Sequence, residues 1–156
     1  MASWFDSIFS SKNKLSDFHL VHTDFHSHLI PAIDDGAKKI EDSVLMIREL
    51  TTLGYKKIIT TPHIMFEYFK NTPEIINSGL QKVRTALNEN KIEITIEAAA
   101  EYYADEFFEK MLDEKSTMLT LGDNYLLFEL PFLNKPMNLE SIIFKIRSNG
   151  YKPILA

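Results

Sequence analysis

Short apolar runs alternate along the chain with longer segments in which apolar residues recur at helical spacing. The short runs are rich in β-branched or nearly continuous apolar residues, and they predict strands at 20–27, 56–61, 92–99, 125–130 and 153–156. The segments between them predict helices over 40–53, 72–90, 105–114 and, starting at Asn138 or Leu139, up to Ser148. Strand–helix units in this order predict an α/β fold of parallel strands with right-handed crossovers, either an open sheet or part of a barrel.

Several element boundaries carry signals of their own. Gly54 follows the first predicted helix where a C-terminal cap is expected. Thr72 and Pro73 fit the N-cap and the first position of the second helix. Pro131 stops the fourth run, whose continuous apolar character is typical of a strand buried on both faces. The chain has no glycine-rich phosphate loop after a strand, which argues against nucleotide-binding α/β folds.

Composition narrows the classes of function. A chain of 156 residues with 45% hydrophobic residues suits one domain with a substantial core. The formal net charge of -5 argues against a nucleic-acid-binding surface, although bound divalent cations would reverse the local sign in a cleft. The absence of cysteine excludes disulfides, thiolate metal sites and a phosphatase with a cysteine nucleophile. No apolar run approaches the ~20 residues that span a bilayer.

Histidines and carboxylates gather directly after the first predicted strand. Because successive side chains of a strand point to opposite faces, His26 and His28 share one face. The carboxylates of Asp34 and Asp35 follow a short turn later. Imidazole and carboxylate together suit Zn, Mn or Fe better than Ca or Mg, so this segment predicts a divalent metal site. Taken alone, it also fits a surface strand with two solvated histidines.

Three further residues of the same chemistry fall near the ends of predicted strands. His63 follows the second strand, Glu101 ends the third, and Glu129 lies at the end of the fourth. In parallel α/β folds the carboxyl ends of the strands form the face where active sites lie. A loop histidine and a solvated carboxylate are the ordinary alternatives for the first two, but an ionised Glu129 inside an apolar strand is costly without a cation or partner. We therefore predict a metal centre on this face, with Asp24 as a supporting residue.

With these residues assembled, the sequence resembles the PHP (polymerase and histidinol phosphatase) superfamily, and within it the bacterial capsule-type, manganese-dependent protein-tyrosine phosphatases. The resemblance runs from about His22 to the last residue. An Asp-Asp-Gly segment after the His-x-His pair favours the tyrosine-phosphatase branch. The motifs that carry the resemblance are Asp24-Phe25-His26-Ser27-His28, Asp34-Asp35-Gly36 with Ser43, Thr61-Pro62-His63, Glu101-Tyr102 and Phe128-Glu129-Leu130-Pro131.

The resemblance implies a distorted seven-stranded (β/α) barrel that holds two or three divalent metals at its carboxyl face, Mn²⁺ first, with Fe, Zn, Co or Mg as substitutes. It implies that the catalytic residues act through bound metals and are His26, His28, Asp35, His63, Glu101 and Glu129. The first two histidines and Glu101 would share one metal, Asp35 and His63 a second, and Glu129 would complete the cluster. Asp35 is preferred to Asp34 because the family's ligand is the second carboxylate of the pair.

The implied reaction is hydrolysis of phosphotyrosine, expected on a bacterial tyrosine kinase that controls capsular or exopolysaccharide synthesis. A phosphomonoester requires charge neutralisation and a strong nucleophile at neutral pH. Clustered metals provide both, because they clamp phosphate oxygens and lower the pKa of a bridging water so that hydroxide attacks in line. Two alternatives stay open: a non-catalytic remnant of a PHP domain that serves as an interaction module, and a PHP phosphoesterase for a small phosphate monoester.

The resemblance also divides the chain. It leaves an N-terminal amphipathic segment, 1–18, before a PHP phosphatase domain, 19–156, that is incomplete at its C-terminus. The first segment lacks a signal-peptide pattern, and a cytoplasmic protein is the simplest expectation. The family continues after its fifth strand with a His-Pro-Glu-Arg segment and later an Asp-x-His pair. We therefore expect five of the seven barrel strands, an open sheet edge that invites homo-oligomers, and weak or absent activity of this chain alone.

Overall fold

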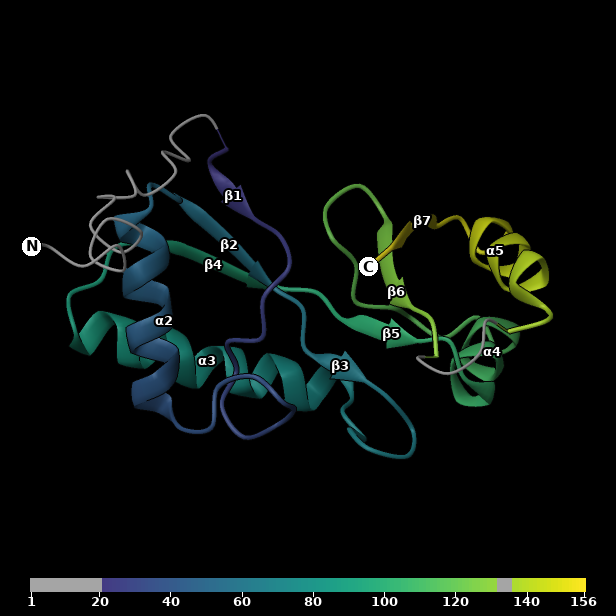
Figure 1. Ribbon diagram of the computed structural model, residues 1–156, viewed down its shortest axis with the longest axis horizontal. Coiled ribbons are helices and arrows are strands. Elements are labelled where there is room, and N and C mark those ends of the chain that lie inside the picture. Colours follow the sequence, from purple (N-terminus) through teal and green to yellow (C-terminus); the bar gives the residue numbers. More distant parts are fainter. Residues whose placement is uncertain (1–20, 132–135) are drawn as a thin grey trace, which may run out of the picture.

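A computed structural model of the chain describes residues 21–131 and 136–156, so the predicted amphipathic segment 1–18 lies outside the described residues. Strands and helices alternate along the described chain (Figure 1), and the predicted α/β class is confirmed. The helices are α2 (Ile40–Thr52), α3 (Pro73–Glu89), α4 (Glu106–Asp113) and α5 (Leu139–Ser148). The strands are β1 (Thr23–Asp24), β2 (Lys57–Thr60), β3 (His63–Ile64), β4 (Thr95–Ala98), β5 (Glu101–Tyr103), β6 (Tyr125–Glu129) and β7 (Lys152–Leu155).

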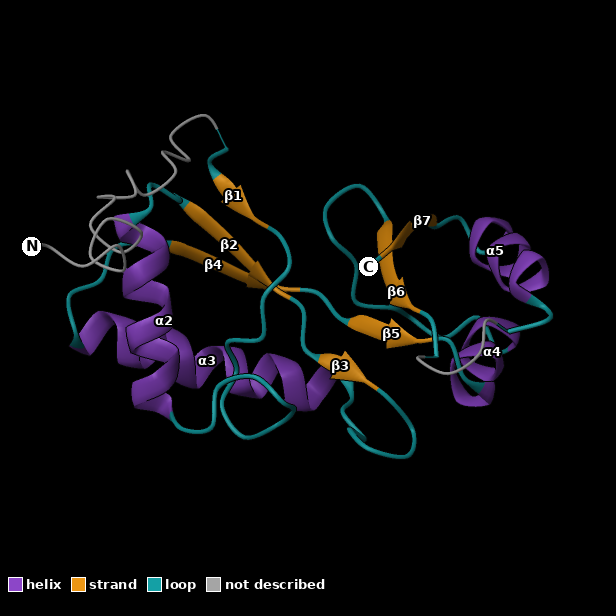
Figure 2. Ribbon diagram, in the orientation of Figure 1, coloured by secondary structure: helices purple, strands orange, loops and turns teal. Residues whose placement is uncertain are grey.

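The named strands pair only in parallel and form two sheets. The first sheet has the order β1-β2-β4, and the second has the order β3-β5-β6-β7. Figure 2 shows α2 and α3 beside the first sheet and α4 and α5 beside the second. The chain steps from the first sheet to the second at two points, between Thr60 and His63 and between Ala98 and Glu101. These two steps bring the sheets together.

Each step follows a predicted strand and leads to a second, short strand. The strand predicted at 56–61 is β2, which ends at Thr60, and β3 begins at His63; Pro62 between them has no N–H to donate to a ladder. The strand predicted at 92–99 is β4, which ends at Ala98, and β5 follows it, where the N–H of Glu101 donates to the carbonyl of Pro62 at 3.1 Å. Glu101 therefore begins a strand instead of ending one, which corrects the sequence-based expectation.

The predicted strand 20–27 is also shorter, since only β1 joins the ladder among the residues described. Beyond β1 a side chain takes the place of a neighbouring strand. The hydroxyl Oγ1 of Thr60 accepts a hydrogen bond from the N–H of Leu29 at 3.0 Å and donates to the carbonyl of Ser27 at 2.7 Å. The N–H of Thr61 donates to the same Ser27 carbonyl at 2.7 Å. The segment with the two histidines is thus anchored to the end of β2 without being a strand.

Helix α3 packs closely on the segment that follows β1. It begins as predicted, with Pro73 at its first position and the Thr72 hydroxyl accepting a hydrogen bond from the N–H of Ile75 at 3.3 Å. At its centre a Cβ on Gly79 would lie 2.2 Å from Cγ2 of Ile30, so only glycine permits this approach. None of the described helices is long and apolar enough to cross a membrane.

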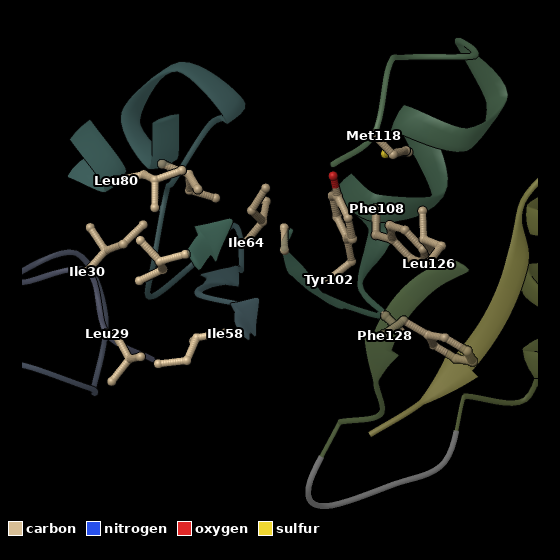
Figure 3. Packing of buried hydrophobic residues seen from close by; sticks show 14 of the residues in the cluster. Leu29, Ile30, Ile58, Ile64, Leu80, Tyr102, Phe108, Met118, Leu126 and Phe128 are labelled. Carbon is tan, nitrogen blue, oxygen red and sulfur yellow. The ribbon is translucent and has the colours of Figure 1, made fainter. Parts of the chain in front are cut away.

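One apolar cluster runs through both halves of the described chain. Figure 3 shows Ile58 and Leu80 on the side of the first sheet and the rings of Tyr102, Phe108 and Phe128 on the side of the second. The ring of Phe108 stacks on Tyr102 at 5.4 Å and on Phe128 at 6.4 Å between centroids. Such ring pairs stabilise by about 0.5–1.5 kcal/mol each. The strands that carry Glu101 and Glu129 are therefore held by aromatic neighbours.

Candidate metal centre

Two histidines enter the site from the segment after β1. The rings of His26 and His28 lie 5.6 Å apart in an edge-on arrangement. His26 Nδ1 lies 3.0 Å from the hydroxyl of Thr61, so Nε2 is turned toward the site. The side chain of His26 is 43% exposed, whereas that of His28 is 15% exposed. Of these two neighbouring rings, that of His26 is thus the more exposed and that of His28 the more buried.

The carboxylate of Glu101 lies at the centre of the site. Its Oε1 lies 3.8 Å from Nε2 of His26, and its Oε2 lies 3.2 Å from Nε2 of His28. The same Oε2 lies 3.3 Å from Nδ1 of His63, which pairs with Glu101 across β3 and β5. The side chain is buried, so one carboxylate faces three imidazole rings with little water around it.

The second sheet brings a further carboxylate to His63. Glu129 ends β6, where it pairs with Tyr103 of β5, and its Oε1 lies 2.9 Å from Nδ1 of His63. The ring of His63 also packs edge-on against His28 at 4.5 Å between centroids. Its remaining nitrogen, Nε2, lies 3.6 Å from Oδ1 of Asp35. His63 therefore connects the carboxylates of β5 and β6 with the turn that follows the first two histidines.

The two aspartates of that turn differ in burial. The Asp34 carboxylate is fully buried, with Oδ2 at 3.0 Å from Nδ1 of His28, whereas the Asp35 carboxylate is 65% exposed. The turn comes back on itself at Gly36, where a Cβ would lie 2.2 Å from the carbonyl oxygen of His28. The next N–H, of Ala37, donates to that same carbonyl at 3.1 Å. Glycine is therefore required for the turn to close over His28.

The protonation states of the site reflect this crowding. Burial alone would lower the pKa of His28, but its contacts with Asp34 and Glu101 outweigh burial and raise the pKa to about 10. Burial likewise opposes the charge on His63, and the neighbouring Glu129 raises its pKa. Burial would raise the pKa of Asp34, but His28 and the N–H of Gly36 hold it below its usual value. A metal ion that binds here therefore displaces protons from imidazole.

The donor set fits divalent metal ions. Three overlapping groups each bring a ligand atom from every member to within 4.8 Å of the others. These groups are His26, His28 and Glu101; His28, Asp35 and His63; and His63, Glu101 and Glu129. Three buried atoms of the cluster (Nδ1 of His28, Nδ1 of His63 and Oε1 of Glu129) contact charged neighbours but are not aligned for a hydrogen bond. A metal ion would coordinate such buried nitrogen and oxygen atoms, which otherwise lack a hydrogen-bond partner among the residues described.

All six residues predicted from the sequence lie together in this cluster, and their role as ligands stays a prediction. Sequence reasoning missed the buried place of Asp34 and the part played by Asn71, whose amide reaches the turn and β3. An Asp two residues before glycine is a turn signal, and the N–H of Gly36 indeed donates to Oδ1 of Asp34 at 3.0 Å. Nothing in the sequence marks Asn71. The supporting role of Asp24 stays a prediction, since its buried Oδ2 has no hydrogen-bond partner in the part of the chain described.

The family model for capsular polysaccharide synthesis, CpsB/CapC, matches residues 22–156. The chain belongs to the CpsB/CapC family. This match, together with the relatives described next, confirms the resemblance to capsule-type tyrosine phosphatases.

Two tyrosine-protein phosphatases are similar to most of this chain. Tyrosine-protein phosphatase YwqE of Bacillus subtilis is 31% identical over 134 residues, covering 85% of this chain and 52% of YwqE. Tyrosine-protein phosphatase CpsB of Streptococcus pneumoniae is 30% identical over 135 residues, covering 85% of this chain and 55% of CpsB. The chain thus spans about half the length of the curated relatives it matches.

A solved structure of the family agrees with the fold. The crystal structures of YwqE from Bacillus subtilis and CpsB from Streptococcus pneumoniae describe metal-dependent tyrosine phosphatases. The match has a TM-score of 0.75 at 30% identity and covers 85% of this chain and 54% of the solved chain. The structural neighbour is metal-dependent, and this chain has groups able to hold metal ions.

Proposed function

We propose that this chain carries the metal centre of a metal-dependent protein-tyrosine phosphatase. The observation that carries the proposal is the convergence of three histidines and three carboxylates in three overlapping groups. The names of the relatives and of the structural neighbour support tyrosine phosphatase as the activity. Because the chain covers about half of those relatives, the activity is proposed for the whole protein.

The proposed ligands divide among two or three ions. His26, His28 and Glu101 hold one ion, Asp35 and His63 hold a second, and Glu129 completes the cluster beside His63 and Glu101. Mixed imidazole and carboxylate donors suit Mn²⁺, which we propose as the natural metal, with Fe, Zn, Co or Mg as substitutes.

The residues of the chain prepare the site for an anionic substrate. Divalent cations at these positions supply charge neutralisation for the phosphate and lower the pKa of water. Without cations, the carboxylates of Asp35, Glu101 and Glu129 repel a phosphate group. The buried Glu101 and Glu129 hold the deep side of the cluster, whereas the exposed side chains of Asp35 and His26 border the side from which substrate and water enter.

The proposal extends to the surroundings of the site. The substrate is phosphotyrosine on a bacterial tyrosine kinase that regulates capsular or exopolysaccharide synthesis, and the protein acts in the cytoplasm. The domain begins near residue 19, and its parallel strands form the N-terminal part of a distorted (β/α)7 barrel. A homo-oligomer is part of the proposal.

Phosphate release from a phosphotyrosine peptide tests the proposed activity. The chain is assayed with Mn²⁺, with and without EDTA, beside a version extended past Ala156 to the length of its relatives. We expect EDTA-sensitive release by the extended version and weaker or no release by this chain. A matched Glu101→Gln variant of the extended version should be inactive.

A small phosphate ester, assayed in parallel, separates the alternatives. Hydrolysis of that ester alone would replace the tyrosine-phosphatase assignment with a small-molecule phosphoesterase. If neither version releases phosphate from either substrate and neither binds Mn²⁺, the result would indicate a non-catalytic interaction module.

A further inference from the structure

Two side chains outside the proposed ligand set tie the aspartate turn to β3. Asn71 lies in the loop between β3 and α3, and it is buried. Its amide Nδ2 donates to the carbonyl of Ile33 at 2.9 Å and to the carbonyl of His63 at 2.8 Å. One amide thus joins two segments, one of them 38 residues away along the chain.

The second connection is made by a side chain of the turn, that of Asp34, which reaches the main chain of β3. The buried carboxylate of Asp34 accepts hydrogen bonds from the N–H of His63 at 3.2 Å and from the N–H of Gly36 at 3.0 Å. Its Oδ2 also lies 3.0 Å from Nδ1 of His28. The main chain of His63 is therefore held by a side chain on its N–H and by another, that of Asn71, on its carbonyl.

The loop that carries Asn71 is itself fixed against His63. Met65 and Phe69 exchange two main-chain hydrogen bonds, of 2.9 and 3.0 Å, and the N–H of Asn71 donates to the carbonyl of Phe69 at 2.7 Å. The ring of Phe69 stacks on the ring of His63, with 5.5 Å between centroids and 10° between planes. Ring, N–H and carbonyl of His63 are thus all contacted by residues outside the proposed ligand set.

This arrangement matters because Asp35 lies on the exposed side of the turn. Its Oδ1 faces Nε2 of His63 at 3.6 Å, although the side chain is 65% exposed and lies outside every strand. A ligand on an exposed turn binds a metal well only if the turn is held in place, since ordering it on binding costs conformational entropy. Contacts behind the ligands generally set metal affinity in this way.

We propose that Asp34 and Asn71 are positioning residues of the metal centre, a clasp that holds Asp35 against His63 before any metal binds. The inference rests on the metal centre proposed above. Neither residue of the clasp belongs to the three groups that could hold a metal ion. The clasp makes metal affinity depend on two residues that are not among the six proposed ligands.

Substitution of the clasp, with matched controls, tests this role. Asp34→Asn keeps the size of the side chain and removes its charge and one of its acceptors. Asn71→Leu keeps a similar volume and removes both donors. Asp105→Asn serves as a control, because the Asp105 carboxylate also accepts two main-chain N–H groups, from Phe108 at 2.8 Å and Phe66 at 3.1 Å, neither on a proposed ligand.

A second control matches the amide. Asn90→Leu removes an amide donor to the carbonyl of Ala86, at the end of α3 and away from the cluster. Mn²⁺ affinity and stoichiometry are measured by titration calorimetry, and the spectrum of bound Co²⁺ reports the number of ligands. Near-UV circular dichroism of the metal-free chains reports whether the core is packed.

We expect both clasp variants to raise the Kd for Mn²⁺ roughly 10- to 100-fold, while Asp105→Asn and Asn90→Leu keep the wild-type Kd. If the folded clasp variants bind Mn²⁺ as tightly as the wild type, the proposed positioning role of Asp34 and Asn71 is wrong, whereas the proposed metal centre is still supported. If the wild-type chain binds no Mn²⁺, the proposed function itself fails. If Asn71→Leu does not fold, Asn71→Ser replaces it in the test, because the serine hydroxyl can donate to only one of the two carbonyls. A wild-type Kd for Mn²⁺ in both Asn71→Ser and Asp34→Asn would then overturn the clasp.

Discussion

The proposed ligands on strands and those on the segment after β1 are held in different ways. His63, Glu101 and Glu129 begin or end strands of the second sheet, and their side chains are 10%, 4% and 11% exposed. His26 and Asp35 lie outside the strands, and their side chains are 43% and 65% exposed. The ladder pairs of the sheet place the first group, whereas side-chain contacts and isolated main-chain hydrogen bonds hold the second.

The difference predicts where the centre is rigid and where it adapts. A residue in a paired strand cannot move without breaking ladder hydrogen bonds and the ring packing around Tyr102. A residue on a turn moves when a single contact is lost, such as that of Thr60 with Leu29 or that of Asp34 with Gly36. Changes of the strand ligands should therefore affect stability and metal binding together, and changes of the exposed side chains of His26 and Asp35 should affect mainly metal binding.

The largest effect is expected for Glu101→Gln. The buried carboxylate faces His26, His28 and His63, so its loss removes a proposed ligand and a partner of the imidazole rings of His28 and His63, whose pKa values are raised. We expect about 3–5 kcal/mol loss of stability in the metal-free chain, as for other broken buried ion pairs, and no measurable Mn²⁺ binding. Urea unfolding measures the stability, and titration calorimetry measures the Mn²⁺ binding.

Glu97→Gln is the matched control for that change, since Glu97 lies on β4 with an exposed side chain paired to Lys57 at 2.8 Å. It should leave both the stability and the Mn²⁺ affinity close to those of the wild type. Equal effects of the two substitutions would contradict the central place of Glu101.

Gly36→Ala tests the turn itself. The added Cβ would lie 2.2 Å from the carbonyl oxygen and 2.4 Å from the Cβ of His28, so the turn has to shift. We expect a loss of about 1–3 kcal/mol, typical of overpacked sites, and weaker Mn²⁺ binding. Gly122→Ala is the control, because its Cβ would meet nothing within 4 Å. Thermal unfolding in EDTA and Mn²⁺ titration of both variants measure the difference, and equal behaviour would show that the turn tolerates the shift.

The pH dependence of the metal-free chain tests the contact between the turn and His28. The pKa of His28 in the folded chain, about 10, lies above its ordinary value of 6.5. A group with a raised pKa stabilises the folded state fully below the unfolded pKa, and this contribution is lost as the pH rises through the folded pKa. In EDTA the free energy of unfolding should therefore fall between pH 6.5 and pH 10.

His28→Gln supplies the comparison for that experiment, since glutamine does not titrate. Urea unfolding across the same pH range should show a flatter profile for the variant than for the wild type. Parallel profiles would mean that His28 does not gain its proton from these contacts.

The smallest effect is expected for His26→Gln. Its side chain is partly exposed, and its nearest carboxylate contact, with Oε1 of Glu101, is 3.8 Å long. We expect Mn²⁺ affinity to fall by about tenfold, the low end for metal-site changes, with no change in the midpoint of thermal unfolding in EDTA. A loss of stability as large as that of Glu101→Gln would show that the turn and strand ligands are not held differently.

The sequence by itself determined the local structure and the chemistry of the site. The helix predicted from Asn138 or Leu139 to Ser148 is α5, which begins at Leu139, and the Thr72-Pro73 signal marks the start of α3. His26, His28, His63, Glu101 and Glu129 were found because each stands near the end of an apolar run, and hydrophobic periodicity shows where such runs end. Asp35 was added by the resemblance of the surrounding motifs to a known family, and the family model bears out that resemblance.

Only the tertiary structure decided how the ends of those runs meet. It placed the steps between the sheets at Pro62 and Ala99, and it separated a buried Asp34 from an exposed Asp35. It also brought Asn71 to Ile33, which lies 38 positions away, and His63 to Asp34, which lies 29 positions away. Hydrogen bonds over such distances in the chain depend on tertiary packing, which no local sequence pattern records. Periodicity describes which face of an element is buried, and the partner on that face is set by the fold as a whole.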